Sequence, residues 1–402
     1  MIRQAYEFEI ITPCFSGGAN PETTAEIRAS AIRGQLRWWF RVLGGFKSLK
    51  PLHGDVHHQE SVIFGDAANE DAASGVIQVR AISGTMESIT QPTMNDLAPD
   101  FDPKGYLVFP LRDKLRAAFY SPDQGAHGGF VLLITLRDNR ILSDDIAALV
   151  TVFANLGSLG FRSRRATGAL RFKDFPYPLS EAFKRFGDGD AINSPGGPLQ
   201  ISKIGGVYSN VNDCVAELAK WLKAYREHGQ SMGSWSWIDK SDKKSGAKWK
   251  PADKAAFAKI SSGRNFGYAR RDHNEGLTAL GHTPPDPDPL KPAGKNGETF
   301  RPALGLPIIQ KFSSIGSNAS PGSKAETEVV WNQTSDGGRF ASPVILRPHR
   351  AADGSWHALV IFVDSKKWNI ANDVYLNGTP RKVSLALYDA MKSDITKLKP
   401  FP

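Results

Sequence analysis

Residues 11–45 read ITPCFSGGANPETTAEIRASAIRGQLRWWFRVLGG. From Ser30, which is suited to cap a helix, to about Leu43, apolar residues fall on one face at helical spacing, and a glycine pair follows as a stop. The basic residues form an i, i+4, i+8 ridge beside the apolar stripe: Arg33, Arg37 and Arg41. The stretch therefore predicts an amphipathic helix with a basic side.

The two tryptophans of this helix are expected to differ, because successive helical residues point about 100 degrees apart. Trp39 lies within the apolar stripe and is predicted to be buried. Trp38 lies nearly opposite, where an exposed indole can stack on a base or fill a partner's pocket. Burial of Trp38 under a neighbouring subdomain is the alternative.

The patterns on either side of this helix predict an α+β fold. The elements follow the order strand, helix, strand, strand, helix, strand over residues 6–10, 30–43, 75–83, 130–137, 143–156 and 169–175. This order is the ferredoxin-like arrangement that RNA-recognition (RRM-like) domains also use. We therefore predict a ferredoxin-like domain at residues 1–178.

The remainder, residues 179–402, is predicted to be a second ferredoxin-like domain with basic and proline-rich insertions. It contains an amphipathic helix at 213–228, a hairpin formed by 343–349 and 356–363, and a last helix at 385–395. The insertions are a lysine-rich stretch at 240–259 and HTPPDPDPLKPAGKNG at 282–297, where prolines exclude a regular element.

Composition limits the class of protein. The chain has 402 residues, of which 41% are hydrophobic, and such a chain can bury a sizeable core. It has only two cysteines, which is too few for a disulfide or zinc framework. The N-terminus lacks the uninterrupted apolar stretch of a signal peptide, and no apolar run is long enough to span a bilayer. We expect a cytoplasmic protein without a membrane partner.

The distribution of charge favours a polyanionic partner. The formal net charge is +9, and three basic stretches contain no acidic residue: 27–50, 146–173 and 339–350. A solvated face would carry mixed signs, whereas these runs lie beside glycines and aromatic residues. Contact with nucleic acid is the favoured interpretation.

A second motif, NLGSLGFRSRRATGAL, occupies residues 155–170. Its glycines, among them Gly157 and Gly160, permit close approach of a ligand to the backbone, and three arginines supply charge. No Gly-Lys-Ser/Thr ends the loop, so nucleotide hydrolysis is not expected. The alternative is a helix end followed by a basic surface turn.

These motifs resemble a known family. Residues 11–45 resemble the N-terminal signature of the first subunits of the Cmr complex, the type III-B CRISPR effector. The glycine-rich motif resembles that of their superfamily, the repeat-associated mysterious proteins (RAMPs). RPALGLPIIQKF at 301–312 and RFASPVILRPHR at 339–350 resemble the C-terminal part of the same subunits.

The resemblance implies a non-catalytic subunit of a ribonucleoprotein in antiviral defence. Such a subunit is expected near the 3′ part of the guide RNA, where it helps capture complementary target RNA. Its implied partners are CRISPR guide RNA, target RNA and other Cmr-type subunits, and no cofactor is implied. The RNA-binding candidates are Arg28, Arg33, Arg37, Trp38, Arg41, Gly157, Gly160, Arg162, Arg164, Arg165, Arg301, Arg339 and Arg347.

Two other functions stay open. A RAMP-type endoribonuclease would use general acid–base chemistry, for which His53, His57 and His58 of HGDVHH are the visible candidates. We expect that segment to be a solvated loop, with no catalytic residue and no metal ligand. A purely structural capping subunit, which binds neighbouring subunits and touches RNA little, is the third reading.

Overall fold

The computed structural model describes residues 1–66, 74–83, 88–89, 105–108, 116–120, 127–139, 141–173, 178–228, 268–282, 298–311, 328–363, 373–396 and 401. The chain forms two compact units, which are described separately. Unit 1 comprises Met1–Ala219, Ile345–Asp364 and Leu398–Pro402. Unit 2 comprises Lys220–Val344 and Ser365–Lys397.

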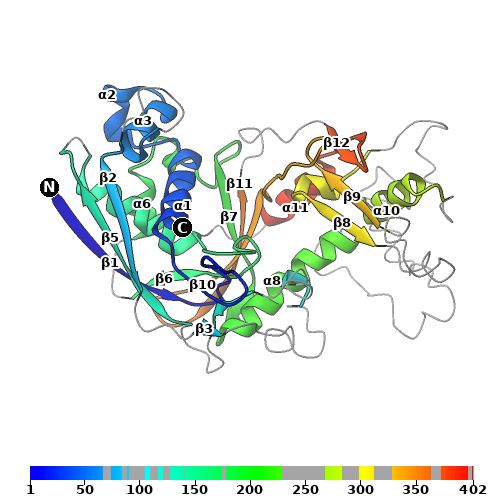
Figure 1. Cartoon of the computed structure of the whole chain (residues 1–402), viewed down its shortest axis with the longest axis horizontal. Coiled ribbons are helices and arrows are strands. Elements are labelled where there is room, and N and C mark those ends of the chain that lie inside the picture. The colour runs from blue at the N-terminus through cyan, green and yellow to red at the C-terminus, as the bar shows by residue number, and fades with distance from the viewer. Residues whose placement is uncertain are drawn as a thin grey trace. The chain divides into compact units, whose positions relative to one another are not determined.

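The first sheet of unit 1 is antiparallel and has the strand order β2-β5-β1-β6. Helices α1 and α6 lie against one face of it (Figure 1). The elements are β1 (Ile2–Ile10), α1 (Ala29–Val42), β2 (Ile77–Ser83), β5 (Gly129–Leu136), α6 (Ser143–Leu156) and β6 (Leu170–Phe172). Their sequence order and strand order are those of a ferredoxin-like domain, so the predicted fold of this half is confirmed.

Alternation along β1 determines which side chains enter the core under α1 and α6. Tyr6, Phe8 and Ile10 are buried, whereas the intervening Glu7 is exposed. The ring of Phe8 stacks on Phe130 of β5 with centroids 5.0 Å apart, and Phe153 of α6 lies 5.8 Å from it. Burial of these aromatic side chains stabilises this part of the sheet.

Helix α1 begins one residue before the predicted start. Arg28 occupies the N-cap position and makes no side-chain capping bond, so the capping role expected for Ser30 is wrong. Ile32, Leu36 and Trp39 are completely or almost completely buried, as their spacing predicted. After the helix, Gly44 has a φ of 79°, a left-handed conformation typical of the residue that ends a helix.

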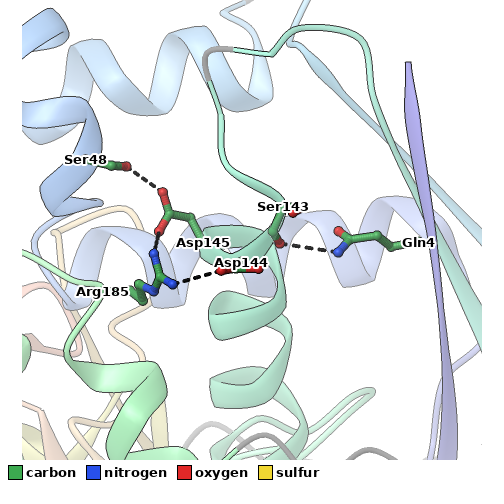
Figure 2. Close-up of polar contacts among 6 residues, drawn as sticks. All are labelled: Gln4, Ser48, Ser143, Asp144, Asp145 and Arg185. Carbon is green, nitrogen blue, oxygen red and sulfur yellow. Dashed lines mark hydrogen bonds and ion pairs between the residues drawn. The ribbon is translucent and has the colours of Figure 1, made fainter.

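An ion-pair network holds the first turn of α6 (Figure 2). Asp145 is buried, accepts a hydrogen bond from the Ser48 hydroxyl and lies 3.5 Å from Nη1 of Arg185. Nη2 of Arg185 lies 2.9 Å from Asp144. Burial raises the pKa of Asp145, while the bonds from Ser48 and Arg185 oppose that rise. The acidic first turn thus connects α6 to two distant segments of the chain.

The second sheet of unit 1 repeats the order of the first three strands. Strands β7 (Leu199–Tyr208), β10 (Val344–Arg350) and β11 (Trp356–Val363) are ordered β10-β11-β7, and α8 (Val211–His228) follows β7. The backbone N–H of Ile201 donates a hydrogen bond to Oδ1 of Asn193. The backbone C=O of Ile201 accepts one from the backbone N–H of Phe401. Phe401 therefore lies at the free edge of β7, where the first sheet has its fourth strand.

Short elements complete unit 1. They are η1 (Lys47–Leu49), α2 (Lys50–His53), α3 (Val56–Phe64), β3 (Ser88–Ile89), α5 (Gly105–Val108), β4 (Ala118–Phe119), α7 (Leu179–Phe183) and η4 (Gly189–Ala191). The loop predicted for HGDVHH is wrong. The segment ends α2 and begins α3, because Asp55 caps α3 by accepting bonds from the amides of His57 and His58 at 2.8 and 3.0 Å.

Unit 2 contains an antiparallel sheet with the order β13-β12-β9-β8. Its elements are α10 (Tyr268–Ala279), η6 (Arg301–Leu304), β8 (Ile308–Lys311), β9 (Glu328–Asn332), β12 (Asp373–Leu376), β13 (Thr379–Lys382) and α11 (Ala386–Thr396). Trp331 and Leu376 are central to its apolar core. Two buried carboxylates of α10 pair with arginines: Asp272 with Arg301 and Glu275 with Arg381, each at 3.0 Å.

The division into units differs from the predicted border. Both ferredoxin-ordered sheets belong to unit 1, so the compact units do not coincide with residues 1–178 and 179–402. The two-domain division at that border stays a prediction.

The insertions predicted at 240–259 and 282–297 lie outside the described residues, apart from His282. Within the described ranges, no helix combines the length and apolar character needed to cross a bilayer.

Candidate nucleic-acid interface

The predicted arginine ridge is present on α1 and is anchored to α3. Arg37 forms an ion pair with Glu60, and Nε of Arg41 lies 3.5 Å from the other oxygen of the same carboxylate. Glu60 is almost fully buried, whereas both arginines keep about 40% of their side-chain surface exposed. Arg33 is exposed and donates to the carbonyl of Phe64 at the end of α3. Two of the three arginines therefore share one buried carboxylate, the third bonds to a backbone carbonyl, and the surface stays basic.

Trp38 of α1 meets Arg164 of the second motif. The guanidinium carbon of Arg164 lies 4.6 Å from the centroid of the Trp38 ring, within the range of a cation–π contact. Trp38 is half-buried and stands edge-on to Trp39, with ring centroids 4.7 Å apart. Burial lowers the pKa of Arg164 to about 10, which leaves it charged at neutral pH. The structure thus brings together two motifs that are more than 100 residues apart in the sequence.

The glycine loop, residues 157–168, lies beside β10. Leu346 donates its amide to the carbonyl of Arg164 at 3.2 Å and accepts from the amide of Ala166 at 3.0 Å. Arg165, between them, is only 5% exposed and donates to the Arg164 carbonyl. Since a buried guanidinium is not available to a phosphate, the RNA-facing role expected for Arg165 is contradicted.

Arg347 is also buried, with no exposed surface. Its Nε donates to the carbonyl of Gly157 at 3.0 Å, and its Nη2 donates to the carbonyls of Ala154 and Leu170. The carbonyls at the end of α6 lack helical partners, so Arg347 acts as a C-terminal cap for that helix. Burial lowers its pKa to about 9. The expected RNA contact at Arg347 is therefore corrected to a structural role.

The two predicted loop glycines are explained by packing within the protein. A Cβ at Gly157 would come within 2.5 Å of the Phe153 carbonyl oxygen. Gly160 has a φ of 82°, and a Cβ there would lie 2.8 Å from the carbonyl of Phe15. The close approach predicted at these glycines is made by the chain itself, so the structure supplies no support for ligand contact there.

The other candidates have different surroundings. Arg28 pairs with Glu26 at 3.2 Å in a largely exposed position, and Arg162 donates to the Leu107 carbonyl at 2.8 Å. In unit 2, Arg301 binds buried Asp272, while Arg339 is exposed. We define the α1 surface as the accessible candidates of unit 1 that lie on or against α1: Arg28, Arg33, Arg37, Trp38, Arg41 and Arg164.

Two of the histidines of HGDVHH, His57 and His58, are described together with their surroundings. His57 and His58 are exposed in the first turn of α3. Across the part of the chain that the structure describes, no three His, Cys, Asp or Glu side chains gather as they would around a metal ion.

Sequence reasoning missed two residues near α1. Arg137, directly after β5, and Gln78 of β2 line a groove together with Arg33 and Arg37. Arg137 ends a stretch that was predicted as a strand, and nothing in the local sequence distinguishes it from any exposed arginine. Only the pairing of β2 with β5 beside α1 brings it to the groove.

Residues 7–171, which include α1 and the glycine loop, match the family model of the RAMP superfamily. The chain is 27% identical over 190 residues to the CRISPR system Cmr subunit Cmr1-2 of Pyrococcus furiosus, an alignment that covers 42% of this chain and 95% of that relative. The crystal structure of Cmr1 from Pyrococcus furiosus in the apo form is similar with 14% identity and a TM-score of 0.47, over 90% of this chain and 88% of that one.

Proposed function

Because this chain belongs to the RAMP superfamily and is of the Cmr type, we propose that it is a non-catalytic RNA-binding subunit of a type III-B CRISPR ribonucleoprotein. The observation that carries the proposal is the contact between Arg164 and Trp38 beside the arginines of α1. Two separate basic motifs thereby form one surface with both charge and an aromatic ring.

The α1 surface has the chemistry that single-stranded RNA requires. A guanidinium group can bind a phosphate through two parallel N–H bonds, and an indole can stack on any base. Arg37 and Arg41 are held by Glu60, so less side-chain entropy is lost when they bind. Such contacts do not depend on base identity, and binding with little sequence preference follows.

In the assembled complex, the subunit lies near the 3′ part of the guide RNA and helps capture complementary target RNA in antiviral defence. Guide RNA, target RNA and other Cmr-type subunits are its partners, in the cytoplasm. Support comes from the similarity to a Cmr subunit and from the resemblance of residues 11–45 to the first-subunit signature. An endoribonuclease or a purely structural cap would contradict this proposal.

The test is a filter-binding titration of the full chain with a single-stranded oligouridylate at several salt concentrations. If the five arginines of the α1 surface neutralise phosphates, log K falls with log salt at a slope of about −3.5. The variant Arg164→Gln should flatten that slope by about 0.7, which is the contribution of one phosphate.

Arg3→Gln is the matched control. Arg3 is an exposed residue of β1. The next residue, Gln4, contacts α6, so its side chain lies on the helix-covered face of the sheet. Because side chains alternate along a strand, the Arg3 side chain lies on the other face. Its replacement should leave the slope unchanged. If the protein does not bind RNA, or if binding does not change with salt, the proposal is wrong and a purely structural capping subunit becomes the favoured function.

A further inference from the structure

A groove of about 740 Å³ lies between α1 and β2 in unit 1. Its α1 side presents Arg33, Gly34 and Arg37, and its other side presents Gln78 and Arg137. β2 is at the edge of its sheet, next to β5. The groove therefore has one helical wall and one strand wall, and neither Trp38 nor Arg164 is among the described residues that line it.

The groove is positively charged. Three of its lining residues are arginines, and Asp66 is its one acidic lining residue among the residues described. Arg137 is exposed, and no ion pair is recorded for it in the described ranges. Ala29 and Ser30, in the first turn of α1, also line the groove. That turn has no acidic residue and no side-chain cap. An anion entering the groove meets several donors and little competing negative charge.

Two of the arginines are held in position before any ligand binds. Arg33 uses one donor on the Phe64 carbonyl, and Arg37 uses Nε on Glu60. A guanidinium has five N–H donors, so each retains donors for a phosphate. Arg33 and Arg37 are four residues apart on a helix, which places their Cβ atoms about 6 Å apart on the same side.

Gly34 leaves the wall of the groove between these arginines open. A Cβ built on Gly34 would meet no atom within 4 Å. No packing contact within the described residues therefore requires glycine here, and helical propensity alone disfavours it. The absent side chain gives a bulky ligand, such as a ribose with its phosphate, direct access to the helix backbone.

We propose that this groove binds the sugar–phosphate backbone of single-stranded RNA, with Arg33, Arg37 and Arg137 neutralising successive phosphates. This inference rests on the proposed RNA-binding function and extends the α1 surface, which already contains Arg33 and Arg37, across the groove to Arg137. A neighbouring protein strand added to β2 is the competing occupant of this edge. Three guanidinium groups favour a polyanion over an extended apolar segment.

A charge series at Gly34 tests the proposal without disturbing the protein's own contacts. A Cβ at this position enters open space, and alanine, glutamate and lysine are all better helix formers than glycine, so each variant should melt at or above the wild-type temperature. Oligouridylate affinity of the full chain should follow the order Gly34→Lys, Gly34→Ala, Gly34→Glu. The glutamate variant should flatten the salt slope by about 0.7 to 1.4, equal to one or two phosphates.

Arg137→Gln is a second, independent variant, because that side chain has no ion pair to lose among the described residues. It should flatten the slope by about 0.7. If the wild type binds RNA in a salt-dependent way and all these variants have its affinity and its slope, the groove does not bind RNA. The proposed function would then remain intact. A wild type without salt-dependent binding would instead overturn the proposed function. If the Gly34→Glu variant binds RNA normally but fails to assemble with the other subunits, the groove binds a protein partner instead of RNA.

Discussion

Trp38 and Trp39 are adjacent in α1 but have different surroundings. Trp39 is 1% exposed within the helix stripe, so Trp39→Ala should lower the free energy of unfolding by about 3–5 kcal/mol. Trp38 is half-buried under Arg164, and its edge-to-face contact with Trp39 accounts for only about 1 kcal/mol. Trp38→Ala should therefore cost far less stability, but should weaken RNA binding by about 1–3 kcal/mol, the loss of one stacked base.

Chemical denaturation and oligouridylate binding measured on both variants separate these effects. Trp38→Phe is the control, because it keeps a ring that can stack under Arg164. If Trp38→Ala destabilises the protein as much as Trp39→Ala, Trp38 belongs to the core and is not an RNA contact.

At the scale of elements, Arg347 of β10 ties the end of α6 to the start of β6. Arg347→Met keeps most of the buried volume but removes the donors to the carbonyls of Ala154, Gly157 and Leu170. Each buried carbonyl without a partner costs about 1–3 kcal/mol, so the unfolding free energy should fall by at least about 3 kcal/mol. Thermal and urea denaturation measure the loss.

Arg339→Met is the matched control from the same sequence motif. Arg339 is exposed, so its replacement should change stability by no more than about 0.5 kcal/mol. Near-normal stability of Arg347→Met together with lost RNA binding would restore the RNA-facing role that the sequence suggested for Arg347.

At the scale of the whole molecule, the question is whether the chain cuts RNA or only binds it. We expect the purified full chain to leave a single-stranded RNA intact, with or without divalent metal. His57→Ala and His58→Ala should change neither this result nor RNA affinity, because both residues are exposed in the first turn of α3.

Denaturing gel electrophoresis of end-labelled RNA is the measurement. As a control, a trace of a known ribonuclease is added to mimic contamination. Its cleavage products should be the same with the wild-type protein and with both histidine variants. Specific products that disappear in both histidine variants would establish the endoribonuclease reading.

Local periodicity was sufficient to predict the first ferredoxin-like half. The spacing of Ile32, Leu36 and Trp39 predicted which side of α1 is buried, because helix and strand geometry alone determine which residues share a face. Element ends were less well predicted. The sequence predicts a loop at HGDVHH, whereas α3 begins there because Asp55 caps it and because the helix packs against α1.

The sequence by itself determined the order of elements, the buried stripe of α1 and the presence of acid-free basic segments. Only the tertiary structure decided which arginines remain accessible. Arg164 stacks on Trp38, whereas Arg347 lies buried among carbonyls that are 177 to 193 positions away in the chain. Charge is a property of the residue, but burial depends on which distant backbone groups converge to replace water around it, and no local pattern encodes that convergence.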